Sequence, residues 1–304
     1  MIISRRTLVQ GACAAALTSA LPRRATSQTT LGDATLTTVS DGNLVLPRSF
    51  AFGTIPEDQL APVLEGFDLN DEQLTPECNL TLYRDGERTV LFDAGSGADF
   101  MPSAGKIQDS LAALDISPDD ITHVVFTHAH PDHIWGTLDD FGDILFQNAS
   151  YLMGRAEWDY WWDPATVDTI DAERQSFAVG AKSRMEAIEG SVEFFDPEEE
   201  VLPGILSVAS YGHTPGHMSF EVRNGGDAIF VVGDAIGNHH VAFRRPEWSS
   251  GSDQDPETGA TTRLKLFDRI MADDLQIAGF HLPGGGMGRV EKAGDGYRFV
   301  EDNG

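Results

Sequence analysis

One short segment of the chain concentrates residue types that bind metals: Thr127-His128-Ala129-His130-Pro131-Asp132-His133. Because side chains two residues apart at the end of a strand point the same way, His128 and His130 can both reach one ion. The chain then turns at Pro131, which lets Asp132 and His133 face a second ion beside the first. Imidazole and carboxylate ligands together suit zinc or another first-row divalent metal. We therefore interpret this segment as part of a two-metal site, whose remaining ligands must come from elsewhere in the chain.

Further candidate ligands stand where predicted strands end. The strand expected over residues 205–210 leads into His213 and His217, that over 229–232 into Asp234, and that over 277–280 into His281. Glycines beside these positions let the backbone approach closely, and ligands at strand ends are how α/β sheets build sites. A lone histidine is more often structural than a ligand, and we interpret His123 in that way.

The rest of the sequence predicts the elements that position these residues. Hairpins are expected around Asp41-Gly42-Asn43 and Asp85-Gly86. A β-branched strand over 124–127 precedes the histidine-rich segment, and Ser117-Pro118-Asp119-Asp120 predicts a capped helical turn. Helices are expected over 107–114, 155–162, 172–188 and 261–271, and a polar surface loop over 246–259. Hairpins followed by mixed strands and helices, without a linker, favour a single layered α/β domain.

The composition is that of a folded, acidic protein. Of the 304 residues, 41% are hydrophobic, and 48 acidic residues stand against 21 lysines and arginines, which gives a net charge of −27. A surface this acidic repels phosphate backbones and anionic lipids, so we expect neither nucleic acid nor a membrane as a partner. Cys13 and Cys78 define no disulfide framework, and we expect Cys78 to be a small buried residue.

Residues 1–27 differ in composition from the rest of the chain. They contain four arginines, no acidic residue and an apolar stretch over 8–21. That stretch is shorter than the roughly 20 residues that a membrane-spanning helix needs. The run Ser4-Arg5-Arg6-Thr7-Leu8-Val9 resembles a twin-arginine export signal. We therefore expect residues 1–27 to be a signal peptide, cleaved after Ala20 or near Ser27, and residues 28–304 to be a periplasmic or secreted domain.

Through the types and order of these candidate ligands, the chain resembles the metallo-β-lactamase superfamily. The matching motifs are His128-x-His130-x-Asp132-His133, Gly212-His213-Thr214-Pro215-Gly216-His217, Gly233-Asp234 and His281. Leu202-Pro203-Gly204-Ile205 and the ending Gly296-Tyr297-Arg298-Phe299-Val300 are similar to its methyl parathion hydrolase-like group. The resemblance implies that residues 28–304 form one hydrolase domain, an αββα sandwich with metals in a groove at one edge.

The resemblance also implies what the candidate ligands do. One metal would be held by His128, His130 and His213, the second by Asp132, His133 and His281, and Asp234 would bridge the two. The metals would be two zinc ions, with manganese, cobalt or iron as substitutes, and a hydroxide shared between them would attack a carbonyl carbon or phosphorus. The carboxylate of Asp132 or Asp234 would then pass the proton to the leaving group.

Other residues are expected to surround the ligands. Asp93 and His217 would hydrogen-bond to ligands without binding metal themselves. In the methyl parathion hydrolase-like group, aromatic residues border the substrate entrance at positions similar to those of Phe100, Trp161 and Phe177. These three are therefore expected to border an apolar substrate pocket.

We expect a dinuclear zinc hydrolase whose partner is a small molecule: a neutral ester, lactone or phosphotriester. Gly237 stands where many lactonases of the superfamily carry a tyrosine, which argues against a specialised lactonase. His239 and His240 either line the pocket or lie on the surface. The alternative function is that of an iron-dependent oxidoreductase of the same fold, because sulfur dioxygenases share the HxHxDH motif. A third alternative, a non-catalytic zinc-binding protein, would lack one of the ligands, and none is missing from the sequence. A homodimer is a further possible assembly of the chain.

Overall fold

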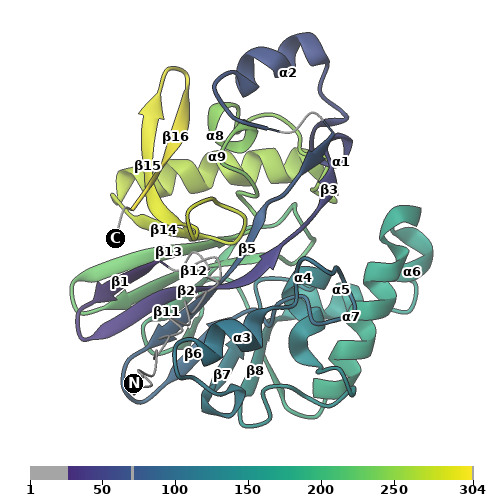
Figure 1. The fold of residues 1–304 in the computed structure, drawn as a ribbon, viewed down its shortest axis with the longest axis vertical. Coiled ribbons are helices and arrows are strands. Elements are labelled where there is room, and N and C mark those ends of the chain that lie inside the picture. The colour runs from purple at the N-terminus through teal and green to yellow at the C-terminus, as the bar shows by residue number, and fades with distance from the viewer. Residues whose placement is uncertain (1–26, 70–71, 303–304) are drawn as a thin grey trace, which may run out of the picture.

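Two sheets of seven strands each form the centre of the fold in this computed structural model, which describes residues 27–69 and 72–302 (Figure 1). The expected signal peptide therefore lies outside the described residues, except for Ser27. The first sheet has the strand order β1-β2-β5-β6-β7-β8-β9, and the second has the order β10-β11-β12-β13-β14-β15-β16. Both sheets mix antiparallel and parallel pairs, and β13 runs parallel to β14.

The strands of the first sheet are β1 (Gln28–Leu31), β2 (Ala34–Asn43), β5 (Glu77–Arg84), β6 (Thr89–Phe92), β7 (His123–Val125), β8 (Ser150–Gly154) and β9 (Val192–Phe195). Those of the second are β10 (Glu200–Leu202), β11 (Ile205–Ala209), β12 (Met218–Asn224), β13 (Asp227–Gly233), β14 (Gln276–Gly279), β15 (Met287–Ala293) and β16 (Gly296–Glu301). A separate pair is formed by β3 (Leu46–Pro47) and β4 (Gln73–Leu74).

The α-helices are α1 (Arg48–Phe52), α2 (Glu57–Leu64), α3 (Ile107–Ala112), α4 (Pro131–Ile134), α5 (Arg155–Trp162), α6 (Thr166–Thr169), α7 (Gln175–Ile188), α8 (Val241–Arg244) and α9 (Pro256–Ala272). Short 3-10 turns cover Pro118–Asp120, Trp135–Thr137 and Ala172–Arg174. Among the described residues, no helix combines the length and the apolar character that a membrane span requires.

The sheets pack face to face, and helices cover the outer face of each. Apolar side chains from both sheets meet between them, as where the rings of Phe92 and Phe220 lie 5.3 Å apart. Helices α3, α5 and α7 pack on the outer face of the first sheet, and α8 and α9 on that of the second (Figure 1). This order of layers confirms the predicted αββα sandwich, formed as one domain.

The prediction of a hairpin around Asp41 is wrong. β2 continues through this residue to Asn43 and pairs with both β1 and β5. Asp41 is buried, and its carboxylate accepts hydrogen bonds from the backbone N–H groups of Ser96 and Ile107, both at 2.8 Å. Asp41, for which the sequence predicts a turn, instead fixes the loop of Ser96 and the start of α3 to β2. The hairpin around Asp85 is confirmed, because this carboxylate accepts N–H groups inside its own turn.

The expected surface loop over 246–259 is also only partly correct. Helix α9 begins inside it, at Pro256, because the Asp255 side chain accepts a hydrogen bond from the backbone N–H of Thr258 and caps the helix. Asp253, two residues earlier, is buried. The segment is therefore partly buried, at Pro246, Asp253 and Gly259, and it lies against the loop that carries His213.

Candidate metal centre

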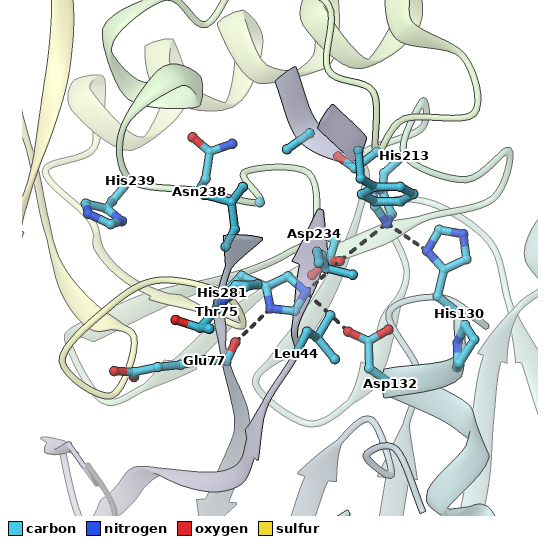
Figure 2. A pocket seen from close by; sticks show the side chains of 18 of the residues that line it. Leu44, Thr75, Glu77, His130, Asp132, His213, Asp234, Asn238, His239 and His281 are labelled. Atoms are coloured by element: carbon cyan, nitrogen blue, oxygen red, sulfur yellow. Dashed lines mark hydrogen bonds and ion pairs between the residues drawn. The ribbon is translucent and has the colours of Figure 1, made fainter. Parts of the chain in front are cut away.

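All seven predicted ligands converge at one edge of the sandwich. Figure 2 shows five of them: His130, Asp132, His213, Asp234 and His281. They form two groups, within each of which the potential ligand atoms lie within 4.8 Å of one another. The three-histidine group contains His128, His130 and His213. The four-residue group contains Asp132, His133, Asp234 and His281.

Local structure accounts for the ligands in the histidine-rich segment. The chain leaves β7 and passes through His128 to His130, whose extended backbone precedes the single turn of α4. Pro131 occupies the first position of that turn, where its fixed φ favours a helix start and its missing N–H is not needed. Asp132 and His133 follow within the turn and so point to a different place from the two histidines before it.

The other ligands follow strands of the second sheet. His213 lies in the loop after β11, while Asp234 and His281 come just after β13 and β14. Because β13 and β14 are parallel neighbours, their carboxyl ends meet at the same sheet edge. The sheet therefore places Asp234 and His281 side by side, with His281 Nε2 at 3.3 Å from Asp234 Oδ2.

Asp234 lies between the two groups. Its Oδ2 is 3.3 Å from Nε2 of His213, and its Oδ1 is 3.4 Å from Nε2 of His133. Within the three-histidine group, Nδ1 of His130 lies 2.9 Å from Nε2 of His213. A carboxylate that contacts imidazoles of both groups has the position that a ligand shared by two cations requires.

The buried atoms of the site fit divalent cations. His128 Nε2, His133 Nε2, Asp132 Oδ2 and Asp234 Oδ1 are all buried without a hydrogen-bond partner. Buried polar atoms are normally paired, because leaving one unpaired costs about 1–3 kcal/mol. Cations bound at the two groups would satisfy these atoms together, and imidazole with carboxylate is a donor set typical of zinc sites.

The electrostatics of the two groups differ. Burial and the neighbouring imidazoles hold the pKa values of His128 and His130 well below the usual range, so both are neutral with free lone pairs. Burial alone would also lower the pKa of His133, but carboxylates led by Asp234 outweigh it and raise this pKa to about 10. Carboxylates likewise outweigh burial at His281, whose pKa lies well above the usual range. The four-residue group therefore attracts positive charge, whereas His128 and His130 offer neutral donors.

Asp93 and His217 lie beside the predicted ligands, and each contacts one of them. Asp93 Oδ2 lies 2.8 Å from Nδ1 of His133, and the same carboxylate accepts hydrogen bonds from the backbone and hydroxyl of Thr127. The Nε2 atom of His217 accepts the backbone N–H of Asp234 at 3.0 Å. His217 thus supports the shared carboxylate rather than the imidazole of His213.

Two further carboxylates support the ligand loops and were not anticipated. Glu157 of α5 is buried and hydrogen-bonds to the loops of both His128 and His213. Asp253 Oδ1 lies 3.4 Å from Nδ1 of His213. Neither had a sequence signal, because one acid in the first turn of a helix and another in a polar loop are ordinary surface patterns.

A mainly apolar cavity of about 280 Å³ opens onto the ligands. Phe100, Phe177, His239 and His240 all line it. The further apolar lining residues are Leu44, Leu46, Phe50, Ala51, Leu69 and Leu74. These come from the segment around β3, β4 and α1, which therefore forms one wall.

Trp161 does not line this cavity, contrary to its expected place at the substrate entrance. Its side chain is buried, and Nε1 donates a hydrogen bond to Glu157 at 2.6 Å. The ring also meets that of His130 edge-on, at 5.7 Å between centroids. The indole therefore packs behind a predicted ligand instead of facing the substrate space.

Cys78 is buried and unpaired with any other described cysteine, as expected. Burial raises the pKa of its thiol to about 12, so the group stays protonated at neutral pH. His281, which lies next to it, opposes this rise without reversing it. The thiol is therefore a small buried side chain and no nucleophile.

Comparisons with known proteins agree with this geometry. A family model described as the metallo-beta-lactamase superfamily matches residues 76–278. No curated protein matches the sequence. Among solved structures, the hydrolase AbOPH of the beta lactamase superfamily is 27% identical with a TM-score of 0.83, covering 91% of this chain and 97% of that one.

Two less similar structures share the fold. AidC, a dizinc quorum-quenching lactonase solved with a product, N-hexanoyl-L-homoserine, is 23% identical with a TM-score of 0.85, covering 91% of this chain and 97% of its own. A probable metal-dependent hydrolase from Staphylococcus aureus is 21% identical with a TM-score of 0.72, covering 90% of this chain and 99% of its own.

Proposed function

The chain belongs to the metallo-beta-lactamase superfamily and is a metal-dependent hydrolase, and on that premise we propose that it is a dinuclear zinc enzyme cleaving a small neutral ester, lactone or phosphotriester. The observation that carries the proposal is the convergence of seven imidazole and carboxylate side chains, six of them buried, beside an apolar cavity. Seven such ligands exceed what one metal needs and suit two that share a carboxylate.

The residues of the site divide the work of hydrolysis. The three-histidine group would hold one cation, and Asp132, His133 and His281 would hold the other. Asp234 would bind both cations. Divalent cations bound there would lower the pKa of water to near 7 and would polarise the carbonyl or phosphoryl oxygen of the substrate. Hydrolysis releases one proton from the attacking water, and Asp132 or Asp234 would accept it and return it to the leaving oxygen.

The cavity supports a substrate with an apolar body and no negative charge. Leucine and phenylalanine side chains make most of its wall, so burying an apolar group there is favourable. Glu77, Asp132 and Asp234 also line it, and the whole chain carries a net charge of −27. Since Arg174 is the only Lys or Arg among the described lining residues, an anionic substrate would meet repulsion.

Within this class we propose activity like that of the methyl parathion hydrolase-like group. The support is that Phe100 and Phe177, two of the aromatic residues that this resemblance sets beside the substrate, line the cavity. The lactonase AidC makes a lactone a reasonable second substrate, but Gly237 lies in the cavity wall where many lactonases carry a tyrosine. We therefore rank esters and phosphotriesters above lactones.

Metal analysis combined with a substrate screen tests the proposal. The purified mature chain should contain two equivalents of metal by mass spectrometry, predominantly zinc, and should hydrolyse at least one chromogenic ester, lactone or phosphotriester. A cephalosporin serves as a comparison from the same superfamily. Two equivalents of metal without turnover of any of these would contradict the substrate class, and two equivalents of iron would favour the oxidoreductase alternative.

We also propose that residues 1–27 direct the chain to the periplasm or out of the cell through a twin-arginine pathway. The support is the paired Arg5-Arg6, the apolar stretch that follows and the lack of acidic residues. Changing both arginines to lysine should leave the full-length chain in the cytoplasm. Continued export and cleavage of that variant would contradict the proposal.

A further inference from the structure

Two consecutive residues, Asp253 and Gln254, lie behind two imidazoles of the three-histidine group. Asp253 Oδ1 is 3.4 Å from Nδ1 of His213, and the side-chain amide of Gln254 is 3.2 Å from Nε2 of His130. In each histidine the other ring nitrogen faces the group, since His130 Nδ1 and His213 Nε2 lie 2.9 Å apart. The segment therefore contacts the nitrogens that a bound cation would leave free.

The position of Asp253 is tightly determined. Its Oδ2 accepts a hydrogen bond at 2.8 Å from Nη1 of Arg263 on α9, and both side chains are buried. The Nη2 atom of Arg263 donates to the Trp248 carbonyl at 2.9 Å, which fixes the guanidinium in turn. A Cβ at Gly259 would lie 2.4 Å from Asp253 Oδ2, so only glycine leaves room for the carboxylate there.

Backbone contacts fasten the same segment to the ligand loop. The N–H of Gln254 donates to the carbonyl of His213 at 3.1 Å, and that of Asp255 donates to the carbonyl of Gly212 at 2.9 Å. The loop before α9 is therefore joined directly to the loop of His213. A change in the Asp253 side chain would therefore act directly on His213.

The unpaired atoms show what Asp253 is placed to do. His213 Nδ1 and Asp253 Oδ1 are both buried without a hydrogen-bond partner, and they face each other. When Nε2 of His213 binds a cation, its proton must sit on Nδ1, where Asp253 Oδ1 can accept it. This contact orients the ring and makes Nε2 a stronger donor.

The two groups differ in how much they need such help. The four-residue group contains the carboxylates of Asp132 and Asp234. The three-histidine group consists of imidazoles alone, and among the described residues the one carboxylate facing it from inside the site is the shared Asp234. Removing negative charge behind it should therefore weaken cation binding there more than at the four-residue group.

We propose that Asp253, held by Arg263, is a positioning residue that determines whether the three-histidine group keeps its metal. The inference rests on the proposed two-metal function and adds that the two positions can be emptied separately. Without the Asp253 carboxylate, the enzyme keeps one metal, held by the four-residue group. Outer partners of metal ligands typically contribute 10- to 100-fold in affinity, so the selective loss should be of about that size.

The test compares Asp253→Asn with Asp255→Asn, a variant of the same residue type two positions away whose side chain only caps α9. Metal content is measured after dialysis against metal-free buffer, and both affinities are measured by titration with zinc. The wild-type chain and Asp255→Asn should keep two equivalents, and Asp253→Asn one. Circular dichroism verifies that each variant is folded. If Asp253→Asn does not fold, Gln254→Ala takes its place; this variant removes the contact to His130 and should weaken metal binding at the three-histidine group.

Double variants identify which metal has gone. Adding His281→Ala to Asp253→Asn should remove the remaining equivalent, whereas adding His130→Ala should leave it in place. Two equivalents in Asp253→Asn with affinities like those of the wild type would overturn the inference, as would loss of both metals together. A wild-type chain that binds fewer than two equivalents would instead contradict the proposed function itself.

Discussion

Glu157 accepts a hydrogen bond from the hydroxyl of Thr214 at 2.7 Å, although 57 positions separate the two residues. The same carboxylate accepts the backbone N–H of Gly216 at 3.0 Å and that of Ala129 at 2.9 Å, and it also accepts Trp161 Nε1. Ala129 stands between two predicted ligands, and Thr214 follows a third. One buried carboxylate on α5 thus joins the two loops that supply the three-histidine group.

Glu157→Gln should lower both stability and activity. All four partners donate, so the ionised carboxylate satisfies them, although burial raises the pKa of Glu157. Glutamine would turn an NH₂ group toward donors, which we expect to cost about 2–4 kcal/mol in the free energy of unfolding. Chemical denaturation measures this cost. Asp159→Asn, on the exposed side of the same helix, is the control, and equal stability of the two variants would refute the role of Glu157.

His128→Ala and Asp234→Asn should each abolish hydrolysis and reduce the bound metal. His128 supplies one of three donors in its group, and Asp234 contributes an oxygen to both groups. Metal content and turnover are measured on the same preparations. His123→Asn is the matched control, because His123 lies outside both groups and contacts the hydroxyl of Thr122. Full activity in either ligand variant would remove that residue from the proposed ligand set.

Phe177→Ala should raise KM for apolar esters by about 10-fold, since the ring lines the cavity and removing it forfeits roughly 1–2 kcal/mol of apolar burial. The effect should shrink with shorter acyl chains, so KM is measured for a series of p-nitrophenyl esters. Val179→Ala lies on the same helix with its side chain exposed and should leave KM unchanged. An equal rise in KM for every chain length would argue against an apolar contact.

His240 should make the folded state less stable in acid. Burial lowers its pKa to about 3, below the value near 6.5 of an unfolded chain, so the unfolded state binds the proton first. The stabilisation is complete above about pH 6.5, and it declines as the pH falls toward the folded-state value. Between about pH 6.5 and 5 the wild type should lose about 1.5 kcal/mol more unfolding free energy than His240→Gln. Parallel pH profiles of the two proteins, at equal metal concentration, would contradict this.

Local sequence was sufficient to predict which imidazoles and carboxylates converge, and also the class of fold. The spacing from His128 to His133 has a defined geometry because a strand end and a proline-initiated turn set the directions of neighbouring side chains. Asp234 and His281 could be found because each directly follows an apolar strand. Such signals depend on residues a few positions apart, because over this range the backbone conformation fixes the relative directions of the side chains.

The partners behind those ligands were decided only by the tertiary structure. Glu157, Asp253 and Trp161 each lie in an ordinary helix or loop sequence, and their roles depend on which distant loop the fold brings against them. At Asp41 the local sequence predicts a turn, but the residue lies in a strand, where its carboxylate accepts hydrogen bonds from backbone N–H groups more than fifty residues away. A carboxylate has no preferred partner along the chain, because its hydrogen bonds and ion pairs are made wherever packing removes it from water.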